Sequence, residues 1–158
     1  MARKSRAAIV ALAVGGAISL IAGFEGFRGT AYVPVRDDKV TIGYGQTFYA
    51  NGRSVRFGDR ITQERAMGEL GVLVEREFLS AIARCVTVPL TQNEFNAYVS
   101  LAYNIGAAAF CKSTLVKKLN TKDYAGACSE ILRWKYSNGR VVKGLENRRL
   151  AEYKICMS

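Results

Sequence analysis

The feature that most constrains this chain is a run of 18 uncharged residues near its start, Ala7 to Phe24. The segment MARKSR, with three basic residues, precedes this run, and Glu25 follows it directly. As a helix the run would be about 27 Å long, at the short end of what crosses a bilayer. Positive charge on its N-terminal side predicts a cytoplasmic N-terminus and an exported remainder. We therefore expect an N-terminal apolar helix that inserts into a membrane.

Four interpretations of this run compete. It is a cleaved signal peptide, a permanent anchor, a buried helix of a soluble fold, or a helix that inserts and later leaves the bilayer. No clean small-residue cleavage site precedes a polar start, and Ala and Gly outnumber Leu and Ile. We favour the fourth interpretation, because Gly and Ala contribute little transfer free energy compared with Leu.

Composition limits the chemistry that the chain can perform. Its 158 residues are enough for one domain with a core, and its net charge of +10 predicts attraction to polyanions. It contains no His, which excludes Ser-His-Asp and Cys-His nucleophiles and the common zinc sites. Carboxylates, hydroxyls or thiols must do any chemistry, and we expect neither cofactor nor metal. The basic residues form no nucleic-acid-reading motif, so we expect no nucleic-acid partner.

Four widely spaced cysteines favour two disulfides over a metal or redox site, because none of them forms a C-x-x-C pair. Disulfides imply an oxidising compartment, outside the cytoplasm. Three pairings are possible, and the alternative is four reduced thiols in the core. The four residues are Cys85, Cys111, Cys128 and Cys156.

The region after the apolar run changes from strand to helical patterns. The sequence GTAYVPVRDDKVTIGYGQTFYANGRSVRFG predicts a β-hairpin around the turn RDDK, with a short third strand, within residues 30–57. From Ile61 onward the apolar period is helical. Thr62 is a suitable N-cap for a long helix that we expect to end near Cys85.

A second helix is marked by a capping box, TQNE, in which Thr91 and Glu94 have the required spacing. Gly106 is a suitable C-terminal stop for it. Shorter helices are expected near residues 114–119, 123–134 and 145–156.

The predicted fold class is therefore α+β, with a small β-hairpin lobe near residues 30–57 and a larger all-α lobe near residues 61–158. We expect two parts in the chain: a membrane-active segment, 1–24, and a folded domain, 25–158. A cleft between two such lobes is a natural place for a ligand.

Carboxylates near the hairpin are few. Glu25 lies between Phe24 and Phe27, where desolvation would favour its protonated form, as a general acid requires. Asp37 and Asp38 lie in the turn, where an exposed carboxylate stays ionised. One protonated and one ionised carboxylate is the arrangement that cleaves a glycosidic bond. The alternative is that Glu25 only ends the apolar run and the two aspartates only form a turn.

Five segments in the same order resemble one family. FEGFRGTAY, TIGYG, LTQNEFNAYVSLAYNIGAAAFCKSTLVKKLN, ILRWKYSNG and GLENRRLAE are similar to the phage-type lysozymes, the endolysins of glycoside hydrolase family 24. The resemblance covers about Phe24 to Cys156. It implies a lysozyme-like fold, and a muramidase that hydrolyses the β-1,4 bond between N-acetylmuramic acid and N-acetylglucosamine in peptidoglycan during host cell lysis.

The resemblance also implies a catalytic set of Glu, Asp and Thr. Glu25 matches the general acid, and Thr41 matches the residue that helps to hold the attacking water. The family usually places its Asp nine residues after the Glu, which is Pro34 here. Relatives with a similar hairpin place an Asp three residues before the Thr. That position is Asp38, with Asp37 as the fallback.

Further roles come from the same resemblance. Tyr103 and Ser113 fall in segments that line the sugar cleft, with packing or helix capping as the alternative. Arg148 resembles an arginine that pairs with the catalytic Glu, with a solvated helix charge as the alternative. Relatives have two separable cysteine pairs, which here would be Cys85–Cys111 and Cys128–Cys156.

The weak apolar leader resembles that of the signal-anchor-release subgroup, whose members stay inactive on the inner membrane until the leader exits. Residues 7–24 would then hold the catalytic domain on the periplasmic face, and release would leave a soluble periplasmic monomer. No cysteine lies in residues 1–24, so we expect activation by a change of topology rather than by thiol exchange.

Two rival functions remain open at this point. A lytic transglycosylase would use the sugar's own hydroxyl in place of water, and its anhydro product would be lighter by one water molecule. A non-enzymatic protein that binds the wall or permeabilises membranes would still clear a cell-wall suspension as the Glu25→Gln variant.

Overall fold

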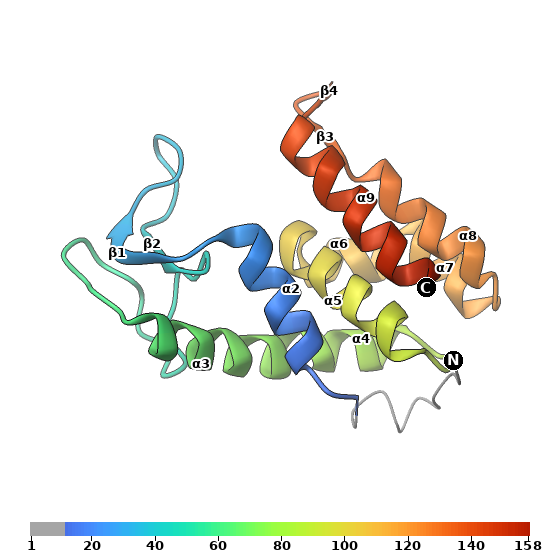
Figure 1. Cartoon of the computed structure of the whole chain (residues 1–158), viewed down its shortest axis with the longest axis horizontal. Coiled ribbons are helices and arrows are strands. Elements are labelled where there is room, and N and C mark those ends of the chain that lie inside the picture. The colour runs from blue at the N-terminus through green and yellow to red at the C-terminus, as the bar shows by residue number, and fades with distance from the viewer. Residues whose placement is uncertain (1–11) are drawn as a thin grey trace.

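The computed structural model describes residues 12–158, which form a small β lobe and a larger helical lobe (Figure 1). This agrees with the expected α+β class. The elements in chain order are α2 (Gly15–Glu25), β1 (Arg28–Tyr32), β2 (Thr41–Gly43), α3 (Gln63–Leu73), the π-helical segment η1 (Val74–Leu79), α4 (Ser80–Cys85), α5 (Gln92–Ile105), α6 (Ala107–Lys112), α7 (Thr114–Asn120), α8 (Tyr124–Glu130), the 3-10 turn η2 (Ile131–Arg133), β3 (Tyr136–Ser137), β4 (Arg140–Val141) and α9 (Lys143–Met157).

Helix α2 packs on the folded protein. It contacts α5 and α3, and its Ala17 and Ile21 are fully buried. The helix predicted over residues 7–24 is observed only from Gly15 onward, and residues 12–14 are not helical. The part of the prediction that covers residues 7–11 lies outside the described residues. Within residues 12–158, no helix combines the length and apolar character that a membrane crossing requires.

The β lobe is built on the antiparallel pair β1 and β2, in which Arg28 faces Gly43 and Tyr32 faces Thr41. The predicted hairpin is confirmed, but the expected third strand is not. In its place single bridges join Thr30 to Arg60 and Phe48 to Ser54. Glycines with positive φ at positions 43, 45, 52 and 58 bend this stretch at short intervals, which prevents a continuous strand.

The helical lobe begins with one long helical rod, α3–η1–α4, which runs beneath both lobes in Figure 1. Thr62 caps its start by accepting a hydrogen bond from Arg65 N, and it ends at Cys85, as expected. The sequence did not predict that six residues of this rod are π-helical. The capping box of α5 is confirmed, and Gly106 ends that helix with a φ of 93°.

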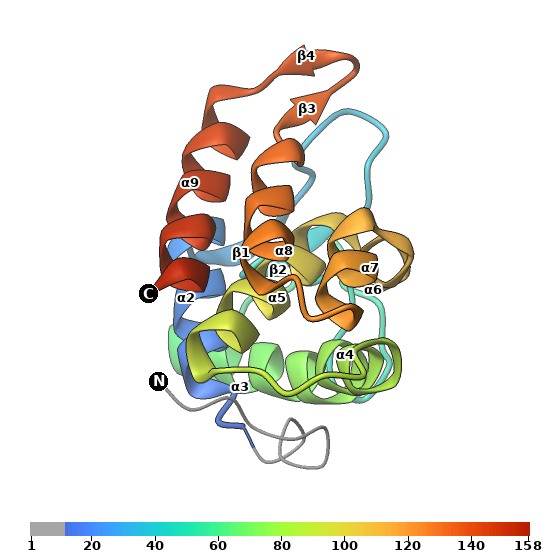
Figure 2. The same cartoon turned by 90° about the vertical axis from the view of Figure 1, so that its right-hand side faces the viewer.

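Two elements were not predicted. Helix α6 fills the stretch after Gly106, and the hairpin β3–β4 lies between the helices expected over 123–134 and 145–156. The hairpin turn contains Asn138 and Gly139, which both have positive φ. Asn-Gly is a strong hairpin signal, so this turn was readable from the sequence. Figure 2 shows the hairpin extending beyond the end of α9.

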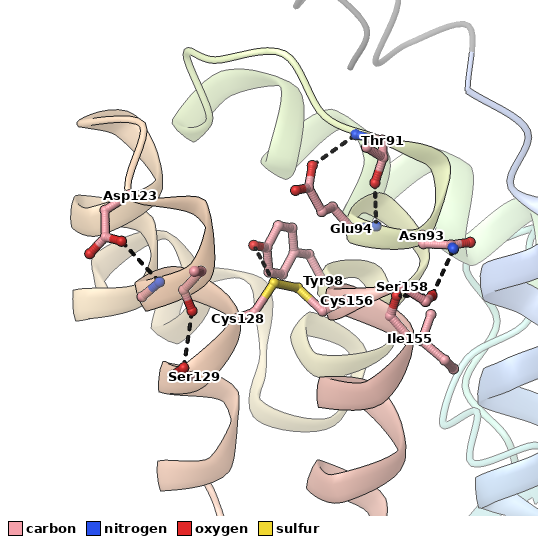
Figure 3. The surroundings of a disulfide bond; sticks show 12 residues. Thr91, Asn93, Glu94, Tyr98, Asp123, Cys128, Ser129, Ile155, Cys156 and Ser158 are labelled. Carbon is pink, nitrogen blue, oxygen red and sulfur yellow. Dashed lines mark hydrogen bonds between the residues drawn. A yellow bond between two sulfur atoms is a disulfide. The ribbon is translucent and has the colours of Figure 1, made fainter. Parts of the chain in front are cut away.

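Two disulfides tie the helices together. Cys85–Cys111 joins α4 to α6, and Cys128–Cys156 joins α8 to α9. This is the pairing that the family resemblance implied. Figure 3 shows the second bond next to the capping box of α5, where the Tyr98 hydroxyl lies 3.7 Å from Cys128 Sγ.

Candidate active site

Glu25 is the last residue of α2, and its side chain is 23% exposed. One carboxylate oxygen, Oε1, accepts a hydrogen bond from Arg148 Nη1 at 2.7 Å. The guanidinium of Arg148 also lies 4.8 Å over the ring of Phe24. Phe27, on the other side of Glu25 in the sequence, is 38% exposed.

Arg148 belongs to a buried charge network that joins α9 to α5. Its Nε donates to Glu152 Oε1 at 3.1 Å, and Ser100 Oγ donates to the same oxygen at 2.6 Å. Arg149 Nε lies 3.1 Å from the other oxygen of Glu152. Burial raises the pKa of Glu152 and lowers the pKa of Arg149 to about 10, below the usual value of an arginine. Two arginines against Glu152 leave one positive charge, which Glu25 balances.

The sequence reasoning singled out Arg148 but missed Glu152, Arg149 and Ser100. The spacing of Glu152 from the two arginines, three and four positions along one helix, allows all three to meet on one face. That pattern alone does not show burial, because it is also typical of solvated helix faces.

The second oxygen of Glu25 faces the turn after β2. A Cβ placed on Gly45 would lie 3.4 Å from Glu25 Oε2, and Gly45 has a φ of +91°. Buried Gln46 holds the turn, since its Oε1 accepts from Tyr44 N at 2.6 Å. The Tyr103 hydroxyl donates to Tyr44 O at 2.8 Å, which links α5 to the same turn. Burial raises the pKa of Tyr103, and the charge of Glu25 adds to this rise, so the phenol stays protonated.

A cleft of about 520 Å³ lies between the two lobes. Residues 45–50 and Gly52 form one wall, α3 and η1 form the other, and Tyr103 closes the side nearest α5. Gly45 and Tyr103 line this cleft and also lie next to Glu25, so the carboxylate stands at the edge of the cleft. This is the inter-lobe position expected for a ligand site.

Asp38 and Thr41 both form hydrogen bonds with the backbone of Lys39. The Asp38 carboxylate accepts from Lys39 N at 2.8 Å, and the Thr41 hydroxyl donates to Lys39 O at 2.9 Å. Asp37 is also exposed and has a φ of 68°. Within residues 12–158, no direct hydrogen bond joins Glu25 to Asp37, Asp38 or Thr41.

Ser113 lies away from the cleft lining. It is the buried N-cap of α7, where its hydroxyl donates to Phe110 O at 2.6 Å and accepts from Val116 N at 3.3 Å. Helix capping is thus the role that its contacts show. In the described part of the chain, no group of three His, Cys, Asp or Glu side chains is placed to hold a metal ion.

Comparisons with known proteins identify the family. The sequence pattern of the family "Phage lysozyme" matches residues 22–152. An endolysin of Acyrthosiphon pisum secondary endosymbiont phage 1 is 42% identical over 141 residues, which cover 84% of this chain and 89% of the relative. A SAR-endolysin of Enterobacteria phage P21 is 33% identical over 165 residues, which cover 96% and 94%.

The fold agrees as well. The solved structure of an endolysin from Escherichia coli O157:H7 phage FAHEc1 superposes with a TM-score of 0.82, at 35% identity and 93% coverage of both chains. Because the family pattern and these relatives span most of the chain, the chain belongs to the phage lysozyme family and is a glycoside hydrolase, an endolysin that cleaves peptidoglycan.

Proposed function

We propose that Glu25 is the general acid of this muramidase and that Oε2 is the oxygen that delivers the proton. The supporting observation is that the two oxygens of the carboxyl group have different neighbours. Arg148 binds Oε1 at 2.7 Å, whereas Oε2 faces Gly45 at the edge of the cleft. Only Oε2 is then placed to protonate the leaving oxygen of a bound glycan.

Asp38 and Thr41 would act on the attacking water. In this proposal Asp38 orients or deprotonates the water, or stabilises the oxocarbenium-like transition state, and Thr41 helps to hold the water. Their shared contact with Lys39 supports Asp38 over Asp37, because the Asp38 carboxylate and the Thr41 hydroxyl bind the backbone of the same residue.

The test is loss of turbidity of purified peptidoglycan with Glu25→Gln, Asp38→Asn and Asp37→Asn. We expect rate losses of about 10²–10⁴-fold for the first two and near-parent activity for the third. Loss in Asp37→Asn with activity retained in Asp38→Asn would reverse the assignment. Products lighter than the hydrolysis products by one water molecule would show that the enzyme is a lytic transglycosylase and not a hydrolase.

Control by the membrane follows from the position of α2. The same residues cannot face lipid and pack on the protein together, and α2 buries Ala17 and Ile21 while it carries Glu25 at its end. In this proposal residues 7–24 first lie in the inner membrane, with the N-terminus in the cytoplasm. Glu25 is then held at the headgroup level, and the site assembles only when the segment leaves the bilayer and docks as α2. The released enzyme would act in the periplasm as a monomer.

The docked structure shows which glycines can test this release. A Cβ at Gly15 or Gly23 would meet nothing within 4 Å, whereas one at Gly16 would lie 2.5 Å from the Asn96 side chain. Gly15→Leu with Gly23→Leu therefore raises apolarity without disturbing the docked helix. Each leucine adds about 1.5–3 kcal/mol of transfer free energy in lipid.

We expect this double variant to stay in the membrane fraction and to delay lysis, while the protein extracted and refolded retains muramidase activity. Gly144→Leu is the matched control, since Gly144 lies in α9 with equally open space around it. Lysis at the parent rate by the double variant would refute release.

A further inference from the structure

The turn at residues 49–53 forms hydrogen bonds across the cleft with side chains of α3 and η1, which form the opposite wall. Ala50 N donates a hydrogen bond to Glu69 Oε2, and Ala50 O accepts one from Arg76 Nη1 at 3.1 Å. Both polar groups of one peptide residue are thus bound by side chains of the rod α3–η1. Glu69 and Arg76 are seven positions apart, which is two helical turns on one face. We call Glu69, Arg76 and Ala50 the clasp.

The carboxylate of the clasp is largely removed from water. The Glu69 side chain is 15% exposed, and its other oxygen lies 3.7 Å from Arg65 Nε. Removing a carboxylate from water is unfavourable unless its oxygens are hydrogen-bonded, so the bond to Ala50 N is a strong constraint on the turn. Arg76, at 50% exposed, also lies 3.3 Å from Glu77 and forms the weaker half of the clasp.

The backbone at the clasp is unusual. Arg76 lies in η1, the π-helical segment, which also contributes Glu77 and Phe78 to the cleft lining. π-helical turns are rare and are frequent at functional sites, because the extra residue changes which side chains face a given direction. Here the π-helical segment forms part of the stretch of the rod that faces the cleft, together with Glu69 and Leu73 of α3.

The turn itself is held together by its own hydrogen bonds. Tyr49 N donates to Arg53 O, and Gly52 N donates to Tyr49 O, both at 2.9 Å. The Tyr49 hydroxyl also donates to Asp59 Oδ2 at 3.1 Å. Because these bonds tie the turn together and the turn lines one wall, its attachment to the rod would set the distance between the walls.

We propose that Glu69 and Arg76 are positioning residues that set the width of the glycan cleft through Ala50. This inference rests on the proposed function and adds to it two residues that bind neither Glu25 nor Arg148. A loosened clasp would let the turn move away from η1. Bound glycan would then lose contact with one wall, whereas the acid at the other end of the cleft would keep its geometry. The effect should therefore appear in KM and not in kcat.

The experiment compares kcat and KM on solubilised peptidoglycan fragments for Glu69→Ala, Arg76→Ala and the double variant. We expect KM to rise by about 5–10-fold in each single variant, with kcat within about twofold of the parent. The double variant should not multiply the two effects, because both side chains act through the same residue. Arg76→Lys keeps a donor for Ala50 O and should restore part of the lost affinity.

Glu75→Ala is the matched control, since Glu75 is exposed on η1 outside the cleft lining. It should behave as the parent. Circular dichroism checks that each variant folds. If Glu69→Ala does not fold, Arg76→Ala is the variant that tests the proposal, because Arg76 is half-exposed and its loss should not unfold the protein. Parent KM in folded variants, or a loss confined to kcat, overturns the positioning role. If the parent and Glu75→Ala both fail to cleave the fragments, the muramidase proposal itself fails.

Discussion

Replacing Arg148 by methionine tests the charge network that holds Glu25. Methionine keeps an unbranched chain of similar length and removes the guanidinium. The change breaks the 2.7 Å bond to Glu25 and the 3.1 Å bond to Glu152. It also changes the sum of charges in the network, because Arg149 alone then balances the two carboxylates that two arginines balanced before.

The magnitude follows from burial. Arg148 is 7% exposed and Glu152 is fully buried, so the pair is shielded from water. Removing one partner of a buried ion pair costs about 3–5 kcal/mol of unfolding free energy. Glu152 keeps Arg149 and Ser100, so we expect a value near the lower end, about 3 kcal/mol. In a domain of this size that lowers Tm by roughly 6–12 °C.

The assay is urea unfolding followed by far-UV circular dichroism, with peptidoglycan turbidity measured on the same samples. Arg133→Met is the matched control, because Arg133 is 74% exposed in its pair with Glu130 and should change stability by less than about 1 kcal/mol. Arg148→Lys should lie between parent and Arg148→Met, since lysine keeps the charge but not the fork of donors. If Arg148→Met unfolds at the parent midpoint and clears peptidoglycan at the parent rate, the network does not hold Glu25.

Three further predictions follow from single contacts. Serine at both positions of Cys128–Cys156 should lower the unfolding free energy by about 3.5 kcal/mol, given the 28-residue separation, and an unchanged urea midpoint would contradict this. Gly45→Ala should lower kcat more than Gly58→Ala, because both glycines have φ near +90° but only Gly45 adjoins Glu25 Oε2; equal turnover in both variants would count against that contact. Burial raises the pKa of Tyr103 above 10.0, so the folded state holds more protons than the unfolded state above pH 10, and stability should fall as pH rises through that range. Urea midpoints on either side of pH 10 should show a smaller fall in Tyr103→Phe, and an identical fall would exclude Tyr103 as its source.

Features that depend on neighbouring residues were predictable. The capping box at Thr91 and Glu94, the stop at Gly106 and the N-cap at Thr62 all formed as expected. Each depends on hydrogen bonds between residues three or four positions apart, which the spacing of residue types specifies. The second hairpin carried an equally local signal at Asn138 and Gly139, between the two helices that were expected on either side of it.

Contacts between distant segments were not predictable from the residues themselves. Glu25 and Arg148 are 123 positions apart, and the family resemblance, not any spacing, indicated their contact. Ser113 shows the same limit, because its position suited a cleft or a helix cap, and its capping contacts with Phe110 and Val116 are visible only in the fold. Long-range contacts depend on which helix faces meet, and a periodic pattern specifies a face but not its partner.

The sequence by itself determined that residues 15–24 carry no charge and that a carboxylate follows them. It did not determine where they reside, because a lipid core and a protein core both favour an apolar helix. The tertiary structure decided that these residues pack against α5 and α3, with Ala17 and Ile21 inside. The physical reason is that a protein core has a fixed shape, into which Ala17 and Ile21 of α2 fit, and it places Arg148 next to Glu25. The lipid core has no fixed shape and contains no arginine to pair with Glu25.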